Sequence, residues 1–547
     1  MNTSIVRWYD KRWFVRFLEI LPGALSWSAL ITPVVMSFFY PVAVAYFIIA
    51  FDLYWTIKSF RMSYYLVRGY GRLHRAQKID WQGRLLWFND PEAYLRDINA
   101  EIAAAKTAKP EKGRLSRLKD DREALRKLVA NKLSLKDPRN IYQAVIIATS
   151  GESRDIIEPS VKALYEADYP MDRMILIIGY EQRGGEALRD TVNDLIAQYG
   201  SGFAAAKGVM HPDGLVGELI GKGANISYSG RELTKMVTDM NIDPSDVVVT
   251  TLDSDHRASK SYFSYLAYEY ASTIDRKHRS FQPIPMFYNN IWDVPAAMRV
   301  IATSNSFWML METMRPWRLR NFASHAQPLD ALIETDYWSV TTIVEDGHQF
   351  WRSYFRFDGD HKVIPLYIPI YQDAVLAESY LKTIRAQYKQ LRRWAWGASD
   401  IEFVVRNSIA NKKAPLLDKI VQLWRLFEGH FSWATSSIIL TSVAWLPLIL
   451  NREFSYHALA HELPMITSSI LQIASVGIVV TILVSIISLP PRPERYKKTK
   501  SIFMVLQWVL LPVTTIVFSS FAALDAQTRL LLNKPLGFYV TEKATKK

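Results

Sequence analysis

The chain has 547 residues, enough for roughly three average domains or for a soluble domain combined with membrane spans. It contains no cysteine, which excludes disulfides and thiolate metal sites. The formal net charge of +13 comes from basic residues that flank apolar segments. This arrangement fits anionic lipid head groups better than nucleic acid, so we expect membrane lipid as a partner and no nucleic acid.

Residues 1–62 are predicted to form an N-terminal membrane hairpin. No charged residue occurs from Leu21 to Phe51, and one helix of that length would be about 46 Å long, beyond a hydrocarbon core of about 30 Å. We therefore divide the segment at Tyr40-Pro41, which gives spans near 17–38 and 41–60. Basic residues at both outer ends place both ends in the cytoplasm.

Residues 63–138 are charged and alternate Ala and Leu with Glu, Lys and Arg. This pattern predicts a helical linker region with two surface helices, separated near Lys109-Pro110. From residue 139 to about 400 the pattern changes, because short apolar strands alternate with helices. Alternation of this kind predicts an α/β domain with a mostly parallel sheet flanked by helices.

Two carboxylates follow one of the predicted strands. Residues 247–252 read as a short buried strand, and Asp253 and Asp255 come directly after it. Open α/β sheets bind ligands at the carboxyl ends of their strands. Hard oxygen ligands suit Mg²⁺ or Mn²⁺ on a diphosphate. Alone, the Asp-x-Asp pattern fits an ordinary acidic loop equally well.

Further motifs appear in a fixed order around this pair: ATSGE, ADYP, GKGAN, LDSD, VED and QLRRW. GKGAN is not a Walker A loop, because Gly223 stands where a Ser or Thr would hold Mg²⁺. The ordered series covers roughly residues 140 to 400. It resembles membrane-integrated family-2 glycosyltransferases with a GT-A fold, the group of cellulose, chitin and hyaluronan synthases. The resemblance implies a GT-A domain at 139–400, between N- and C-terminal transmembrane helices.

The resemblance also implies roles for individual residues. Asp253 and Asp255 would hold the donor diphosphate through Mg²⁺ or Mn²⁺, and Asp346 would be the general base, beside Glu345. The other implied donor-binding residues are Glu152, Glu181, Lys222, Asn225, Gln390 and Arg393, and Trp394 would stack on the acceptor sugar. Ala148 and Gly151 occupy the places where the first motif of the group usually has a Pro and often an Asn. The Asp that recognises the nucleobase or ribose in the group has no clear match here, and Glu181 is the nearest carboxylate to its position.

The chemistry is also consistent with the residues alone. An inverting sugar transfer needs one carboxylate to deprotonate the acceptor and a cation to stabilise the leaving diphosphate. Glu345 and Asp346 also fit a charge pair at a helix N-terminus. The aromatic stretch from about 280 to 340 fits sugar stacking and lipid packing equally well.

The chain returns to the membrane after residue 400. Residues 401–431 predict interfacial amphipathic helices, and residues 432–547 predict a transmembrane region and tail, with spans near 432–450, 464–489 and 502–524. The basic connector 491–500 is expected in the cytoplasm. Five spans would place the C-terminus outside although the tail is basic, so its side stays open.

The sequence thus predicts a multi-pass enzyme of the plasma or inner membrane with a cytoplasmic catalytic domain. It would be an inverting glycosyltransferase that moves a sugar from a nucleotide-diphosphate donor, with a UDP-sugar favoured, to a polysaccharide or lipid-linked acceptor. The alternatives are an enzyme that adds a single sugar to a lipid and a catalytically inactive membrane scaffold.

Overall fold

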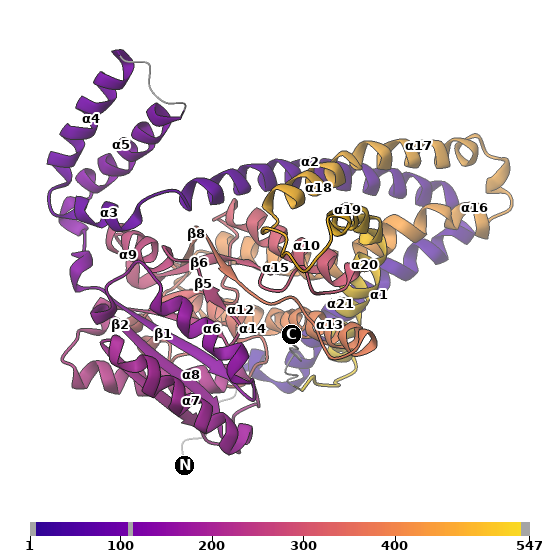
Figure 1. The fold of residues 1–547 in the computed structure, drawn as a ribbon. Coiled ribbons are helices and arrows are strands. Elements are labelled where there is room, and N and C mark those ends of the chain that lie inside the picture. Colours follow the sequence, from indigo (N-terminus) through magenta and orange to yellow (C-terminus); the bar gives the residue numbers. More distant parts are fainter. Residues whose placement is uncertain (1–6, 108–112, 538–547) are drawn as a thin grey trace.

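The chain forms a mixed α/β sheet with flanking helices, and long apolar helices from both ends of the chain lie together beside it (Figure 1). The computed structural model describes residues 7–107 and 113–537. The predicted break near Lys109-Pro110 and most of the basic tail lie outside the described residues. The expected fold class, an α/β domain inserted between terminal apolar helices, is confirmed.

The sheet has eight strands in the order β3-β2-β1-β4-β7-β6-β8-β5. The strands from β3 to β4 are parallel to their neighbours, and β6 is parallel to β8. Strand β7 is antiparallel to both β4 and β6, and β5 is antiparallel to β8. The sheet is therefore mostly parallel, as expected. The strands are β1 (Tyr142–Thr149), β2 (Met174–Glu181), β3 (Ala205–His211), β4 (Val247–Asp253), β5 (Arg257–Ala258), β6 (Arg279–Met286), β7 (Ala326–Pro328) and β8 (Lys362–Tyr371).

Helices cover both faces of the parallel half. Val145 and Ile147 of β1 belong to the core under α6, α7 and α9, whereas Ala144 and Ile146 belong to the core under α8 and α11. Successive side chains of a strand point to opposite faces, so a strand covered on both sides is apolar throughout. These helices are α6 (Arg154–Tyr165), α7 (Gly185–Tyr199), α8 (Lys222–Asp239), α9 (Tyr262–Ser272) and α11 (Leu329–Glu334).

The N-terminal helices break where the sequence predicts. Helix α1 (Arg12–Phe39) ends before Tyr40, and α2 (Pro41–Ala76) begins at a proline, which suits the first helical position. Helix α2 continues past the predicted hairpin boundary at residue 62. It does so because Leu66 and Leu73 are buried in a core shared with α10 (Ala296–Thr313). The α/β domain and the apolar helices therefore share one hydrophobic core.

Within the described parts of the chain, four helical stretches are long and apolar enough to cross a membrane: Arg12–Phe39, Pro41–Ala76, Ala458–Ser488 and Thr499–Leu531. The span predicted at 432–450 is not among them. Helix α15 (Leu416–Ser442) instead runs without a break across residue 431, where the sequence analysis placed a boundary. The α-helix ends at Ser442, and the apolar residues up to Leu450 belong to a separate short helix.

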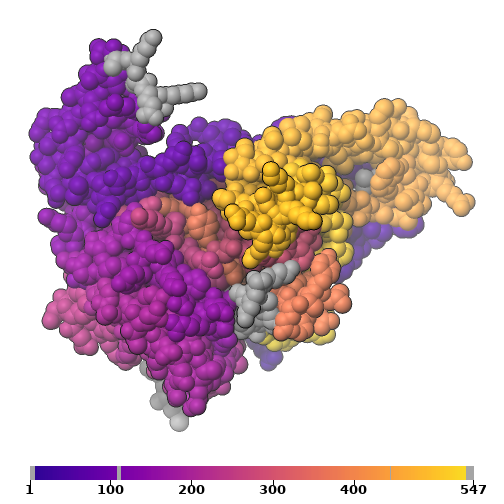
Figure 2. All heavy atoms as spheres, in the orientation of Figure 1, coloured from indigo at the N-terminus to yellow at the C-terminus, as the bar shows by residue number. Residues whose placement is uncertain are grey.

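A charged helical hairpin projects from the body of the molecule (Figures 1 and 2). It consists of α4 (Pro91–Thr107) and α5 (Arg114–Ala130), whose apolar residues Ile102 and Leu118 face each other. The remaining helices are α3 (Trp81–Leu85), α12 (Glu345–Arg356), α13 (Tyr380–Ala395), α14 (Asp400–Ala410), α16 (Leu446–Leu450), α17 (Ala458–Ala474), α18 (Val476–Ser488), α19 (Thr499–Leu506), α20 (Leu511–Thr514) and α21 (Phe521–Leu531).

Candidate active site

The Asp-x-Asp pair lies at the carboxyl edge of the sheet, as the sequence predicts. Asp253 is the last residue of β4 and pairs in register with Ala148 near the end of β1. Asp253, Asp255 and His256 each offer one ligand atom, and these atoms all lie within 4.8 Å of one another. The side chain of Asp253 is 37% exposed and that of Asp255 only 5%. Asp253 is therefore the carboxylate that an incoming ligand reaches first.

Protein contacts hold this cluster in place. His256 Nε2 lies 3.4 Å from Asp253 Oδ2 and 4.0 Å from Asp255 Oδ1. Asp255 Oδ2 accepts a hydrogen bond from the backbone N–H of Asp373 at 2.9 Å. Two carboxylates with one imidazole are a donor set that fits Mg²⁺ or Mn²⁺. His256 was not predicted, although its position beside Asp255 is a usable signal because His is the commonest metal ligand.

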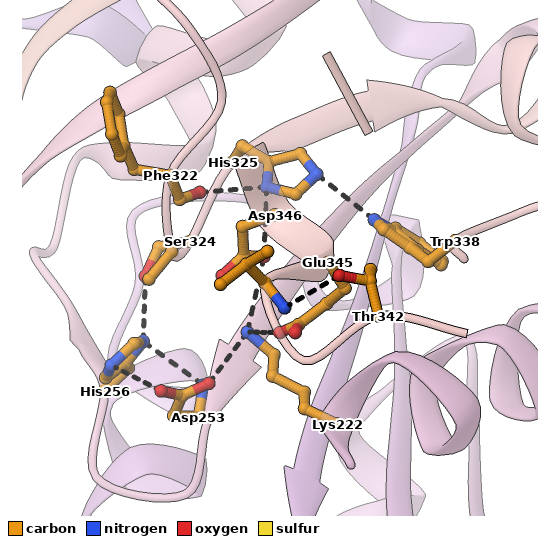
Figure 3. Close-up of polar contacts among 12 residues, drawn as sticks. Lys222, Asp253, His256, Phe322, Ser324, His325, Trp338, Thr342, Glu345 and Asp346 are labelled. Carbon is orange, nitrogen blue, oxygen red and sulfur yellow. Dashed lines mark hydrogen bonds and ion pairs between the residues drawn. The ribbon is translucent and has the colours of Figure 1, made fainter. Parts of the chain in front are cut away.

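Lys222 joins the strand-end pair to the predicted base. Its Nζ lies 2.8 Å from Asp253 Oδ1, 3.6 Å from Asp346 Oδ1 and 3.9 Å from Glu345 Oε1 (Figure 3). Burial by itself lowers the pKa of Lys222, but the charges of the three carboxylates outweigh burial and raise that pKa. Lys222 is therefore positively charged throughout the neutral range. The structure brings four predicted site residues into one cluster.

The cluster depends on a close approach at the start of α8. A Cβ atom on Gly223 would lie 2.4 Å from the carbonyl oxygen of Ser339 and 3.1 Å from Cβ of Glu345. Any side chain at this position would push α8 away from the segment that leads into α12. Gly223 thus has a steric role.

Glu345 and Asp346 form the first turn of α12. Carboxylates are favourable at a helix N-terminus. A charge pair at the helix start is therefore compatible with a role in the active site, which stays a prediction. Burial, followed by the charge of Asp346, raises the pKa of Glu345, while Lys222 and Arg393 act in the opposite direction. The side chain of Asp346 is 20% exposed, against 3% for Glu345. Asp346 is the carboxylate that can contact a substrate.

A second histidine that the sequence analysis missed contacts Asp346. His325 is fully buried, and its Nδ1 lies 3.5 Å from Asp346 Oδ1. No local pattern marks this residue, because the contact depends on the pairing of β7 with β4.

The QLRRW motif, with Gln390, Arg393 and Trp394, lies on α13. The charge of Arg393 acts on the pKa of Glu345, which places the end of α13 near the start of α12. The Trp394 ring lies 6.3 Å from that of Phe287, centroid to centroid. Gln390 Oε1 accepts a hydrogen bond from Gln387 Nε2 at 3.1 Å. An ion pair of 2.8 Å between Arg392 and Asp525 fixes α13 to α21.

Three other predicted donor-binding residues make contacts with protein groups in this structure. Glu152 Oε2 accepts hydrogen bonds from the Thr149 hydroxyl and from two backbone N–H groups of its own turn. Glu181 lies 3.3 Å from His211, which also contacts Glu218 at 2.9 Å. Asn225 Nδ2 donates to the Gly179 carbonyl at 3.1 Å, which fixes α8 to β2. Their donor-binding roles stay predictions.

Replacement of Lys222 by Met is expected to destabilise the fold. Loss of one partner from a buried ion pair costs on the order of 3 kcal/mol, at the lower end of the usual range because Asp253 remains partly exposed. The raised pKa of Lys222 keeps its contribution in full below about pH 10.5, so the lysine itself causes no change between pH 5 and 8. The destabilisation should shrink toward pH 5 as Glu345, whose pKa burial raises, takes up a proton.

Melting temperatures in detergent at pH 8 and pH 5 measure this effect. Lys207→Met is the matched control, because Lys207 forms a 3.0 Å ion pair with Glu232 at the surface, where such pairs contribute about 0–1 kcal/mol. Equal decreases in melting temperature for the two variants would contradict a central role for Lys222.

The model for glycosyl transferase family group 2 matches residues 248–520. The match begins within β4 and includes Asp253, Asp255, Asp346 and α13. No curated protein matches the sequence. Among solved structures, the mannosyltransferase PcManGT from Pyrobaculum calidifontis in complex with GDP-Man and Mn²⁺ is 14% identical with a TM-score of 0.40, covering 81% of this chain and 100% of that chain. TarS 1-349 from S. aureus in complex with UDP-GlcNAc is 14% identical with a TM-score of 0.35, covering 62% of this chain and 90% of that chain.

Proposed function

We propose that the chain, which is a glycosyltransferase, transfers a sugar with inversion from a nucleoside-diphosphate donor to an acceptor hydroxyl at a membrane surface. The observation that carries the proposal is the single cluster in which Lys222 contacts Asp253, Glu345 and Asp346. In this cluster the strand end that we propose for the diphosphate lies beside an accessible carboxylate, which supports the proposal. The four apolar helices support membrane association.

The residues divide the chemistry between them. Asp253, Asp255 and His256 would hold Mg²⁺ or Mn²⁺, which supplies positive charge for the leaving diphosphate when bound. Asp346 takes the proton of the acceptor hydroxyl. The acceptor oxygen forms its bond to the anomeric carbon from the face opposite the diphosphate, and the bond from that carbon to the diphosphate oxygen breaks. Lys222 contacts all three carboxylates and orders them before the donor arrives.

The acceptor side is formed by aromatic rings. Trp394 of α13 and Phe287, just after β6, lie side by side, and aromatic faces of this kind can stack on sugar rings. We propose a UDP-sugar as the donor and a glycan or lipid-linked sugar as the acceptor. Transfer of one sugar to a lipid and repeated addition to a polymer both use this geometry.

Product analysis tests the proposal and separates the two acceptors. Membrane vesicles that contain the protein are incubated with Mn²⁺ and radiolabelled UDP-sugars or GDP-sugars in turn. Label in the organic extract indicates a lipid-linked product, and label in the insoluble residue indicates a polymer. Vesicles with Asp346→Asn are the control. Absence of labelled product with every donor would contradict the proposal.

The proposed topology makes a separate prediction. The chain has no cysteine, so single cysteines can be introduced at the exposed positions Glu186, Lys497 and Tyr456. The catalytic domain and the basic connector are expected in the cytoplasm. The connection between α16 and α17 is expected outside, because Asn451 donates a hydrogen bond to the Phe38 carbonyl beside the turn between α1 and α2, which the hairpin prediction places outside. A membrane-impermeant maleimide should therefore label intact cells only at position 456. Labelling of position 186 or position 497 without permeabilisation would refute the topology.

A further inference from the structure

Two buried residues, Trp338 and His325, form a series of contacts that leads to Asp346: Trp338 contacts His325, and His325 contacts Asp346 (Figure 3). Trp338 is 1% exposed and His325 is 0% exposed. The indole Nε1–H of Trp338 donates to His325 Nε2 at 3.2 Å. On the other side of the imidazole, Nδ1 lies 2.9 Å from the Phe322 carbonyl oxygen and 3.5 Å from Asp346 Oδ1.

These contacts determine which imidazole nitrogen carries the proton. An indole N–H can only donate, so His325 Nε2 must be the acceptor. The proton of the neutral ring then lies on Nδ1, which donates it to the Phe322 carbonyl, while the contact of Nδ1 with Asp346 Oδ1 at 3.5 Å is electrostatic. Burial lowers the pKa of His325, and the charge of Lys222 also lowers it, while Asp346 and Phe322 raise it with a smaller total effect. His325 is therefore a neutral donor with a defined direction.

The backbone around His325 is held from two sides. The carbonyl of His325 accepts a hydrogen bond from Thr251 N–H at 3.4 Å, and β7 then pairs with β4 from Ala326 onward. Ser324 has a φ of 66°, a left-handed conformation that is uncommon outside glycine. Such strain persists where the surroundings fix it, and it clusters at functional sites. In this conformation Ser324 Oγ lies 2.8 Å from His256 Nδ1.

We propose that His325 is a positioning residue for Asp346: its fixed imidazole, with Nδ1 3.5 Å from Oδ1, keeps that carboxylate oxygen inward by an electrostatic contact and leaves Oδ2 for the proton of the acceptor hydroxyl. Oδ1 is the oxygen that contacts both Lys222, at 3.6 Å, and His325. With Oδ1 held, rotation of the carboxylate is restricted and Oδ2 has a defined direction. The inference rests on the proposed function, in which Asp346 is the general base.

Substitution of His325 should reduce the rate rather than donor affinity. His325→Leu removes the donor, and a misplaced base is expected to lower kcat by roughly 10- to 100-fold. The donor KM should change less than about threefold, because Asp253, Asp255 and Lys222 form the donor side. His325→Asn should retain kcat within about fivefold of wild type, since its amide N–H can occupy the position of Nδ1–H.

A third variant keeps the test decisive if His325→Leu does not fold. His325→Gln is polar and similar in size, but its amide reaches the position of Nε2 rather than that of Nδ1. The inference predicts high kcat for Asn and low kcat for Gln. Kinetics are measured with the UDP-sugar or GDP-sugar that wild-type vesicles turn over, and melting temperatures confirm the fold. Equal kcat values for wild type, Asn and Gln would overturn the inference.

A double variant separates positioning from a general structural role. If His325 acts through Asp346, His325→Gln should lower the residual rate of Asp346→Asn by less than about twofold, because coupled residues are not additive. A full additional loss would show that His325 acts independently of the base and would overturn the inference. Near-normal transfer by Asp346→Asn alone would instead overturn the proposed function, so the two failures are distinguishable.

Discussion

Replacement of Asp346 by Asn is expected to lower the transfer rate by roughly 10²- to 10⁴-fold, the usual cost of losing a general base. Asn keeps the shape of the side chain, but it cannot accept a proton at neutral pH. Donor binding rests on Asp253, Asp255 and Lys222, so nucleotide affinity should stay within a few-fold. Sugar transfer and the binding of UDP with Mn²⁺ are measured on the same preparation.

The same chemical change at an exposed carboxylate is the control. The side chain of Asp336 is 78% exposed and forms an ion pair with Arg231, so Asp336→Asn should leave transfer unchanged. A carboxylate with only a structural role would lose folded yield, binding and activity together. That parallel loss, or near-normal transfer by Asp346→Asn, would show that Asp346 is not the base.

Replacement of Asp255 by Ala should abolish the dependence on a divalent metal together with most of the activity. The metal is expected to supply several kcal/mol of charge stabilisation to the leaving diphosphate. Its loss therefore corresponds to a decrease of roughly 10²- to 10³-fold in turnover. Turnover is measured with Mn²⁺ and with excess chelator, in wild type and variant.

Chelator should lower the wild-type rate to about the level of the variant and should have little further effect on the variant. Asp190→Ala on α7 is the control, because that carboxylate is exposed at the surface, with a side chain 66% accessible. Undiminished turnover of Asp255→Ala in excess chelator would refute the metal assignment.

The parts of the fold that could be predicted are those with a local pattern. Strand β4 and the pair Asp253 and Asp255 follow from a β-branched run that ends in carboxylates. The break at Tyr40 follows from the length of an uncharged segment. The far end of α2 could not be predicted, because residues 63–76 look polar and charged in sequence. Burial of Leu66 and Leu73 against α10 makes this part of the helix a component of the core.

The residues around Phe203 predict a short strand, whereas β3 spans Ala205–His211. Its burial is partial, so it lacks the continuous apolar run that marks β1 and β2. Pairing with β2, rather than its own composition, makes this segment a strand.

The site shows the same division between local and long-range information. The motif series brought Lys222, Glu345 and Asp346 to attention, and the structure joins them to Asp253 in one cluster. His325 was missed because its contact with Asp346 depends on the antiparallel register of β7 and on the left-handed backbone of Ser324. Asn225 was assigned from its motif, yet its side chain fixes α8 to Gly179, a contact visible only in three dimensions.

Release of nucleoside diphosphate by the purified protein tests the central claim most directly. The protein in detergent is offered UDP-sugars and GDP-sugars one at a time, with Mn²⁺, with Mg²⁺ and with excess chelator. We expect at least one donor to release its UDP or GDP in the presence of a metal, with the release lost in chelator and in Asp255→Ala. A folded protein that releases neither nucleotide from any donor with either metal would contradict the account.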